Sequence, residues 1–513
     1  MIFKKIFFFL IILLDYSSGS KILGIFPTFV RSHYYLANTL MNHLAEKGHR
    51  VTVISPFLDE NPAKNNSYQN VVLTGLDDLK DTVNMFDYVN TNELLFIVLS
   101  IKKSLEMTEL VLNHTNVQYL LQSNEKFDLV IMERFVNEAY VGFAEHFNCP
   151  YIVLSTFGTN PWINVLTGNP APPSYIPNPS MPLSSKMNFW ERQLNTLMYI
   201  YVHFLHNFYA FPGQKLLYEK YFNASTNFYD VLYRPSLVLL NSHPVTNQPV
   251  PYVPNMIDIG GFHIKPRRKI SKDLQIFLDE AKEGVIYFSM GSFLKSTQQS
   301  PEKHEIFLKT FSKLKLKVLW KWESDRLANQ SRNIRIEKWV LQQSVLEHPN
   351  VRLFITHGGL LSISEAVHSG IPMLVVPVFG DQKINSRHVA DQGMGLWLEY
   401  HDVTESTLTK KINEILYNPI YLENVKLKSK IYNDRLVDPL DVATYWVEYV
   451  IRHKGAPHLR IEGVNLSWYK YFLIDVIITI LMCVFIAFYL ICIVLRTISS
   501  FYFKCKCEKV KLN

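Results

Sequence analysis

The chain has 513 residues, of which 48% are hydrophobic and 13% aromatic, and its formal net charge is +7. This length is too great for one compact core and predicts two domains, while the apolar content excludes intrinsic disorder. Lys and Arg are spread along the chain instead of forming a basic patch, so the charge does not favour nucleic-acid binding.

Residues 1–20 have the layout of a secretory signal peptide. Lys4 and Lys5 precede an apolar run at 6–14, and small residues at 18–20 offer a cleavage point before Lys21. The apolar run is too short to span a bilayer. The alternative interpretation of this segment is a buried first strand.

A second apolar run, at 476–495, contains no charged residue and is long enough to cross a membrane as a helix. Aromatic residues lie on its N-terminal side, and Arg496 begins a basic tail at 496–513. The positive flank predicts a cytosolic tail and a lumenal body, which is single-pass type I topology. Lys509 and Lys511 resemble a dilysine retrieval signal, so we expect the endoplasmic reticulum membrane.

Cysteines and sequons are consistent with this topology. Cys149 is the one cysteine between the signal peptide and the apolar run, so the lumenal part cannot form an internal disulfide. Glycosylation sequons predict a glycoprotein, and they begin at Asn65, Asn113, Asn223, Asn329 and Asn465.

Between the two ends, short apolar runs alternate with helical stretches. The first series predicts strands at 22–26, 51–54, 129–132, 151–154 and 237–240 and a helix at 32–47. Near-continuous apolar strands separated by helices indicate a parallel sheet covered on both faces. We therefore expect one doubly wound domain at 21–245.

Two aromatic-rich segments in this domain, at 91–121 and 187–211, have the length and apolar content of helices. Three interpretations stay open for them. They can be core helices, they can line an apolar pocket, or they can touch the bilayer.

A segment at 243–254 with four prolines predicts an interdomain linker. A second series follows, with strands expected at 284–289, 317–320, 352–356 and 373–376. The sequence thus predicts a second doubly wound domain at 246–455 and a membrane-proximal linker at 456–475. Ligands bind beyond the carboxyl ends of such strands, so the expected site is a cleft between the domains.

The sharpest motif lies in the second domain. Residues 354–359 run from a strand through His357, Gly358 and Gly359 into a helix. Glycines let the backbone approach a ligand, and a helix N-terminus attracts a phosphate. On these residues alone the segment predicts an anion site.

The residues around that motif make it specific. Trp339 and Gln342 precede it, and Glu365, two prolines and the pair Asp381-Gln382 follow. This pattern resembles the signature of the UDP-glycosyltransferase family, which includes UDP-glucuronosyltransferases, and the likeness to insect-type membrane-anchored members extends over the whole chain. The resemblance implies two Rossmann-like domains that face a cleft (GT-B type) and one C-terminal transmembrane helix.

The resemblance also implies how the donor binds. Trp339 and Gln342 would hold the uracil, and Glu365 would accept hydrogen bonds from the ribose hydroxyls. Asp381 and Gln382 would bind the sugar hydroxyls. The diphosphate would be bound by Ser292, His357, Gly358 and Gly359.

One position departs from the family pattern. Many members have Asn where this chain has Leu361, and that Asn helps to bind phosphate. Here we expect Ser362 or backbone N–H groups to serve instead.

For catalysis, the family resemblance makes His33 the general base that deprotonates the acceptor hydroxyl, with inversion at the anomeric carbon. A carboxylate normally orients that imidazole. The aligned residue is Glu133, one methylene longer than the usual Asp, and Glu138 is the alternative. The resemblance implies no metal, because inverting transfer in this family needs none, and no cofactor, because the UDP-sugar is a co-substrate.

The expected activity is transfer of a hexose to small lipophilic acceptors, a type of conjugation used in detoxification. Val250 replaces an Arg that members using UDP-glucuronate often carry, which favours glucose over glucuronic acid. The alternatives are a catalytically silent family member in a membrane complex and a lipid-binding carrier. The sequence leaves homo- or hetero-oligomerisation open.

Overall fold

The computed structural model describes residues 19–59, 62–63, 67–76, 84–89, 91–223 and 225–511, with side chains as far as Phe503. The signal peptide expected at 1–20 lies outside the described residues up to position 18, as does the sequon at Asn65. The chain divides into two compact units, the first ending at Arg460 and the second beginning at Ile461.

The first sheet has seven strands in the order β3-β2-β1-β4-β5-β6-β7, and every neighbouring pair is parallel. Its central strands are buried on both faces, as parallel strands between helical layers are. The strands are β1 (Lys21–Ile25), β2 (Arg50–Ser55), β3 (Tyr68–Val72), β4 (Leu129–Glu133), β5 (Tyr151–Ser155), β6 (Leu237–Leu240) and β7 (Met256–Asp258).

The second sheet has six parallel strands in the order β10-β9-β8-β11-β12-β13. Two doubly wound parallel sheets confirm the expected fold class. The strands are β8 (Val285–Ser289), β9 (Lys317–Lys321), β10 (Ile334–Glu337), β11 (Val351–Thr356), β12 (Met373–Val375) and β13 (Gly395–Trp397).

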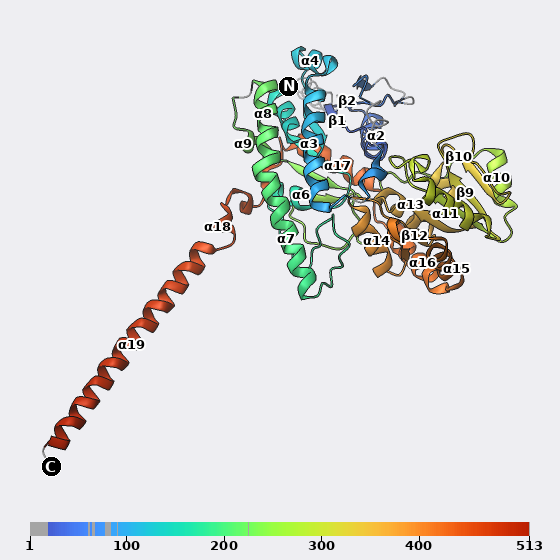
Figure 1. The fold of residues 1–513 in the computed structure, drawn as a ribbon. Helices are drawn as coiled ribbons and strands as arrows, with labels where there is room; N and C mark the ends of the chain where they lie inside the picture. The colour runs from blue at the N-terminus through green and yellow to red at the C-terminus, as the bar shows by residue number, and fades with distance from the viewer. Residues whose placement is uncertain are drawn as a thin grey trace, which may run out of the picture. The chain divides into compact units, whose positions relative to one another are not determined.

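Helices surround both sheets (Figure 1). Those preceding β7 are α2 (Arg31–Glu46), η2 (Met85–Tyr88), α3 (Glu93–Leu112), α4 (Thr115–Gln122), η3 (Glu138–Tyr140), α5 (Val141–His146), α6 (Pro161–Thr167), α7 (Phe189–Leu205), η4 (His206–Ala210), α8 (Phe211–Phe222) and α9 (Phe228–Leu232). Those following are α10 (Lys272–Asp279), η5 (Ser296–Gln298), α11 (Pro301–Ser312), α12 (Gln342–Leu346), α13 (Leu360–Ser369), α14 (Gln382–Asp391), η6 (Tyr400–Asp402), α15 (Glu405–Tyr417), α16 (Pro419–Asn433), α17 (Pro439–Arg452) and η7 (Pro457–Leu459).

The first sheet recruits two elements from beyond the expected boundary at residue 245. β7 pairs with β6, and α17 packs its Ala443, Val447 and Val450 into the apolar cluster that covers this sheet. These three residues follow one another at helical spacing, so they form one stripe that faces the cluster. The chain therefore returns to the first sheet after completing the second.

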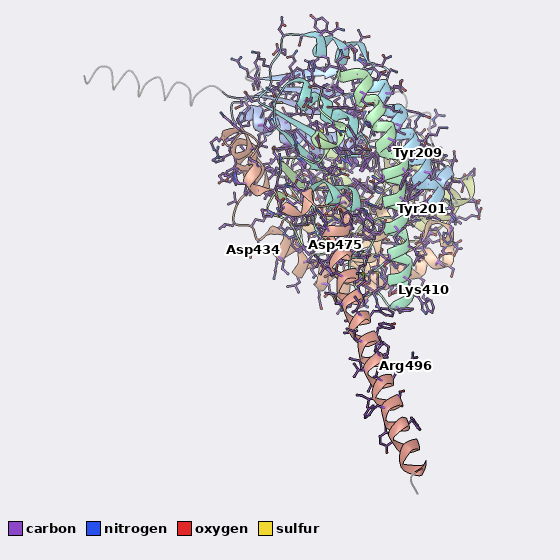
Figure 2. All side chains as sticks on the ribbon, turned by 90° about the vertical axis from the view of Figure 1, so that its left-hand side faces the viewer. Tyr201, Tyr209, Lys410, Asp434, Asp475 and Arg496 are labelled. Atoms are coloured by element: carbon purple, nitrogen blue, oxygen red, sulfur yellow. The ribbon has the colours of Figure 1, made fainter. Side chains whose placement is uncertain are left out.

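The aromatic-rich segments form helices with two different faces. The segment at 91–121 is divided into α3 and α4, and the segment at 187–211 continues through a π-helical turn at η4 into α8. Met198 and Val202 of α7 are buried, whereas Trp190 and Leu197 on its other face are 73% and 63% exposed. Tyr201 and Tyr209 mark the course of this long helix in Figure 2. These helices thus supply core on one side and leave an apolar face open on the other.

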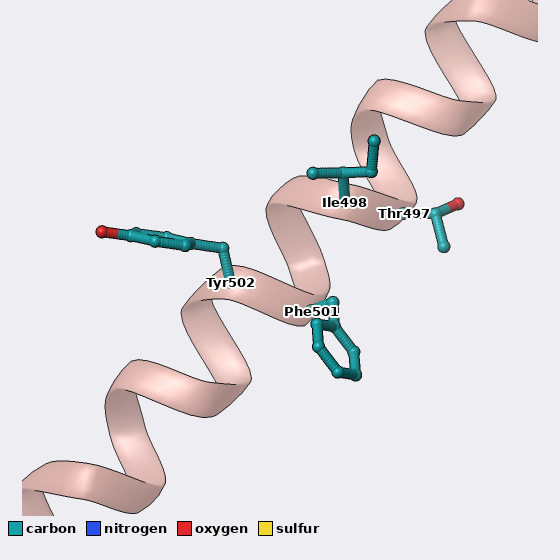
Figure 3. A pocket seen from close by; sticks show the side chains of 4 residues that line it. All are labelled: Thr497, Ile498, Phe501 and Tyr502. Atoms are coloured by element: carbon teal, nitrogen blue, oxygen red, sulfur yellow. The ribbon is translucent and has the colours of Figure 1, made fainter.

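The second unit contains the membrane-type helix. After η8 (Glu462–Asn465) and α18 (Trp468–Tyr471), helix α19 runs over Ile474–Lys511. Its segment Ile474–Phe503 is long enough to cross a membrane, contains an 18-residue window of mean hydropathy 3.1, and includes the span expected at 476–495. Figure 3 shows side chains of Thr497, Ile498, Phe501 and Tyr502 projecting from this helix.

The asparagines of the four described sequons, Asn113, Asn223, Asn329 and Asn465, are all exposed.

Candidate functional site

The polar pair His33–Glu133 lies where two neighbouring strands of the first sheet end. Glu133 is the last residue of β4, and His33 is the third residue of α2, which follows β1. Nδ1 of His33 makes a hydrogen bond to Oε1 of Glu133. Thr156, which follows β5, donates a second hydrogen bond to the same Oε1 at 3.1 Å. The carboxylate is 1% exposed and the imidazole 16%, so the imidazole is the member of the pair that a ligand can reach.

The surroundings of His33 favour its protonated form. Burial alone lowers the pKa of His33, but the charge and hydrogen bond of Glu133, together with the charge of Asp381, outweigh burial and raise it. A base with this environment gains a proton readily, and the negative charge of the buried carboxylate stabilises the imidazolium that forms.

Glu138, the alternative partner of His33, forms an ion pair with a different residue. It lies in η3 and forms an ion pair with Nη2 of Arg134 at 2.8 Å, with both side chains almost fully buried. An ion pair at this depth needs both partners, because removal of one would leave an uncompensated buried charge. The structure therefore brings Glu133, and not Glu138, to His33.

His357 occupies the turn between β11 and α13, in a slot between two glycines. A Cβ added at Gly291 would lie 2.5 Å from its ring, and one at Gly359 would lie 2.6 Å from it. Gly358, which lies between His357 and Gly359 in the chain, has a φ of +90°, which residues with a side chain rarely adopt. Burial, followed by the charge of Lys321, lowers the pKa of His357 to about 4. Its ring is therefore neutral at pH 7 and offers one N–H donor beside the N-terminus of α13.

Glu365 of α13 is held by two amides of α12. Nε2 of Gln342 donates to its Oε2 at 2.6 Å, and Nε2 of Gln343 donates to its Oε1 at 3.3 Å. Gln342 also donates to Ser362 at 3.1 Å and accepts from the hydroxyl of Tyr287 at 3.1 Å. Burial raises the pKa of Glu365 to about 7, although both amides act in the opposite direction. In this arrangement Gln342 orients the carboxylate, and its expected contact with uracil stays a prediction.

Three further positions frame this site. Trp339 follows β10 and is 59% exposed, so much of the residue is open to solvent, and Nζ of Lys321 lies 5.8 Å from its ring centroid. Ser292 lies half-buried in the loop after β8. Leu361, the departure from the family pattern, packs against the apolar cluster of the first sheet. At this position the chain has an apolar contact between domains in place of an amide.

Asp381 is the residue before α14 and Gln382 is its first residue, and the two side chains have different hydrogen-bond partners. Asp381 accepts from Nδ2 of Asn385 at 2.8 Å, and burial raises its pKa while the Asn385 bond and the charge of His33 lower it. Oε1 of Gln382 accepts from the backbone N–H groups of Val378 and Phe379, so this oxygen closes the loop on itself.

Sequence reasoning missed Thr156, Gln343 and Asn385, which orient Glu133, Glu365 and Asp381 respectively. Each had a weak local signal. Thr156 is a polar residue just after an apolar strand, Gln343 adjoins Gln342, and Asn385 lies one helical turn after Asp381. Among the described residues, no group of three His, Cys, Asp or Glu side chains is placed to hold a metal.

Comparison with known proteins adds the family. Residues 21–510 match the family described as UDP-glucoronosyl and UDP-glucosyl transferase. The chain is 38% identical to UDP-glycosyltransferase UGT5 of Dactylopius coccus, over 92% of this chain and 91% of that protein. It is 32% identical to UDP-glucosyltransferase 2 of the same organism, over 98% of each. It is 31% identical to human UDP-glucuronosyltransferase 2B17, over 91% and 92%.

Solved structures agree on the fold. The glycosyltransferase VinC in complex with DTDP has a TM-score of 0.57 and 15% identity, covering 84% of this chain and 100% of that one. The calicheamicin glycosyltransferase CalG4 has a TM-score of 0.55 and 17% identity, covering 85% and 98%. The two-sheet architecture is therefore that of GT-B glycosyltransferases. With a family match across nearly its whole length, the chain belongs to the UDP-glucoronosyl and UDP-glucosyl transferase family and is a glycosyltransferase that uses a UDP-sugar.

Proposed function

We propose that the enzyme transfers a hexose with inversion and that His33 is its general base. The hydrogen-bonded pair His33–Glu133 carries this proposal, because the imidazole is the more accessible member of the pair, the carboxylate is buried, and the charge of Asp381 in the second domain acts on His33. The acceptor hydroxyl gives its proton to Nε2 of His33 as its oxygen attacks the anomeric carbon. The bond from that carbon to UDP then breaks, and UDP leaves with the electron pair.

The second domain would hold the donor. Trp339 would stack on the uracil, and Glu365, oriented by Gln342 and Gln343, would accept from the ribose diol. His357, Ser292 and the backbone of Gly358, Gly359 and Ser362 would bind the diphosphate. Asp381 and Nε2 of Gln382 would bind the sugar. A metal has no role in this scheme, since these neutral donors and the N-terminus of α13 stabilise the phosphate charge.

Glucose is the proposed sugar. Val250 supplies no cation for a uronate carboxylate, and one relative with 98% coverage is named a UDP-glucosyltransferase. Other relatives are named UDP-glucuronosyltransferases. The rates of transfer from UDP-glucose and from UDP-glucuronate therefore have to be compared to identify the sugar.

Small lipophilic molecules are the proposed acceptors. An aromatic series extends from His33, with Phe135 edge-on to the imidazole at 5.5 Å, Phe157 next at 6.2 Å and Trp162 beyond it at 6.1 Å. Phe135 is 37% exposed. Apolar rings beside a base favour a ligand that presents one hydroxyl on an apolar body.

The proposed location is the endoplasmic reticulum membrane, with the catalytic unit in the lumen. The candidate span Ile474–Phe503 and the basic residues after it support single-pass anchoring with a cytosolic tail. The open apolar face of α7 and η4, which includes Trp190 and Leu197 of α7 and Phe208 of η4, supports additional contact with the bilayer surface.

The test uses membranes that contain the full chain. UDP release and conjugate formation are measured with UDP-glucose and UDP-glucuronate against phenols and steroids, for wild type and His33→Ala. Acceptor-dependent release by wild type alone would support the proposal. Equal background rates would favour a silent family member, and failure of UDP to raise the melting temperature would favour a lipid carrier.

A further inference from the structure

The two domains also meet beside the Asp381 loop, through a pair that the reaction scheme does not use. Lys383, in the first turn of α14, donates from Nζ to Oε2 of Glu93 at 2.6 Å. Glu93 is the first residue of α3, in the first domain. The side chains are 25% and 19% exposed, so solvent screens this pair less than a surface pair. Oε1 of Glu93 is buried and has no hydrogen-bond partner.

A row of four phenylalanine rings runs beside this ion pair. Phe96 of α3 lies 5.9 Å from Phe379, which lies 6.2 Å from Phe293, which in turn lies 5.8 Å from Phe29. The row begins and ends on first-domain segments and has two second-domain rings between them. Phe29 belongs to the turn that leads into the helix of His33, and Phe379 belongs to the loop that leads into Asp381.

The segment before α3 is fixed on the second domain as well. Phe86 of η2 is buried in the apolar cluster of the second sheet and packs 5.2 Å from Tyr400. Nδ2 of Asn84 donates to the carbonyl of Gln298 at 3.2 Å. The ion pair is therefore one of several contacts by which residues 84–89 and 91–96 are held against the second domain.

These contacts act on the loop that carries Asp381. That loop turns at Gly380, whose φ is +62°, and is closed internally by Gln382. Phe379 lies just before the turn and Lys383 just after it, and both contact α3. The loop is thereby clamped on both sides, with Asp381 between the clamps.

We propose that Glu93 and Phe96 are positioning residues that hold this loop closed over the reacting centre, so that the anomeric carbon meets the acceptor and not water. This inference rests on the proposed function. When the clamp opens, the oxygen of a water molecule attacks the anomeric carbon and His33 takes its proton. The bond to UDP breaks, and the products are free sugar and UDP without conjugate. Exclusion of water is a general requirement of sugar transfer from an activated donor.

Glu93→Gln in the full-length protein tests this. The substitution keeps the size of the side chain and removes its charge. We expect the ratio of UDP released to conjugate formed to rise about fivefold, as for the loss of one coupled pair. The KM for UDP-sugar should rise, while inhibition by UDP alone stays unchanged, because the nucleotide contacts lie elsewhere. Glu106→Gln is the matched control, since Glu106 lies on the same helix in an exposed pair with Lys103 at 3.3 Å.

The charge swap Glu93→Lys with Lys383→Glu should return the ratio toward the wild-type value, which loss of fold would not. An unchanged ratio and KM in Glu93→Gln would overturn the inference, as would a lower melting temperature with an unchanged ratio. The increase in melting temperature caused by a bound ligand tests the clamp independently of the proposed activity. Even if the wild type proved inactive, the clamp predicts that Glu93→Gln loses the extra stabilisation by UDP-glucose over UDP, and an undiminished increment would contradict it.

Discussion

His33, in the helix that follows β1, and Glu133, the last residue of the neighbouring parallel strand β4, are joined by a hydrogen bond from imidazole to carboxylate. Glu133→Gln removes the charge and keeps the shape. We predict a loss of kcat/KM of about 100-fold or more, because the imidazolium that forms in the transition state loses its counter-charge. Initial rates of conjugate formation measure this.

Glu138→Gln provides the contrast, since Glu138 pairs with buried Arg134 and does not contact His33. It should lower the melting temperature through the uncompensated guanidinium and leave kcat per folded molecule near wild type. Equal kinetic losses in both variants would contradict the assignment of Glu133.

The pH profile reports the environment of His33. Only the neutral imidazole accepts a proton, and the pKa of His33 is raised because Glu133 and Asp381 outweigh burial. Activity should therefore fall on the acid side of the profile, with a midpoint above the ordinary histidine value. Glu133→Gln removes the largest raising influence, so its acid limb should move to lower pH. The measurement is kcat/KM from pH 5 to 9, and a limb that stays in place would argue against His33 as the titrating base.

Glu365 predicts a pH dependence of donor binding. Its pKa of about 7 results from burial, and only the ionised carboxylate accepts from both ribose hydroxyls. The KM for UDP-sugar should rise as pH falls below 7, and Glu365→Gln should raise KM and abolish this dependence. Isothermal titration with UDP at pH 6 and pH 8 provides the check.

The same raised pKa has a consequence for stability. Glu365 binds its proton more tightly in the folded protein than in the unfolded chain. Its contribution to the free energy of unfolding is therefore fully present below pH 4.5, the ordinary pKa of a glutamate, and is lost as pH rises through about 7. At pH 8 the unliganded Glu365→Gln variant should be more stable than wild type, by at most about 3.5 kcal/mol, since one pKa unit is worth about 1.4 kcal/mol. Denaturant unfolding at pH 5 and pH 8 would refute this if the gain were equal at both.

Trp339→Ala tests nucleotide stacking. The side chain is 59% exposed in the unliganded protein, so its removal should cost little stability. The affinity for UDP should fall about tenfold, as expected for loss of one aromatic stacking partner. Tyr417→Ala, at a residue 78% exposed on α15, is the control and should leave UDP binding unchanged.

The central strands of both sheets were predictable from the sequence, and the outer strands were not. All nine expected strands are present with limits that differ by no more than one residue at either end. The four that sequence reasoning missed, β3, β7, β10 and β13, are the outer strands of the two sheets. Outer strands are paired on one side only and are partly exposed, so Tyr68–Val72 and Ile334–Glu337 include polar residues that interrupt the apolar run.

Long-range packing explains the other differences. Nothing local in Pro439–Arg452 indicates that α17 covers the first sheet, because an amphipathic stripe does not name its partner. The sequence also does not decide between Glu133 and Glu138 as the partner of His33. That choice follows from the structure, in which the guanidinium of Arg134 pairs with Glu138. Motif residues such as Glu365 could be identified from the sequence. Gln343 and Thr156, which orient the carboxylates, could not.

The most direct test of base-catalysed, inverting transfer is the anomeric configuration of the product, determined by NMR for wild type and His33→Ala. With UDP-α-glucose and a phenolic acceptor, the account predicts a β-glucoside from wild type and a rate at least about 100-fold lower from His33→Ala. An α-glucoside, or a conjugate formed at the same rate by both proteins, would contradict it.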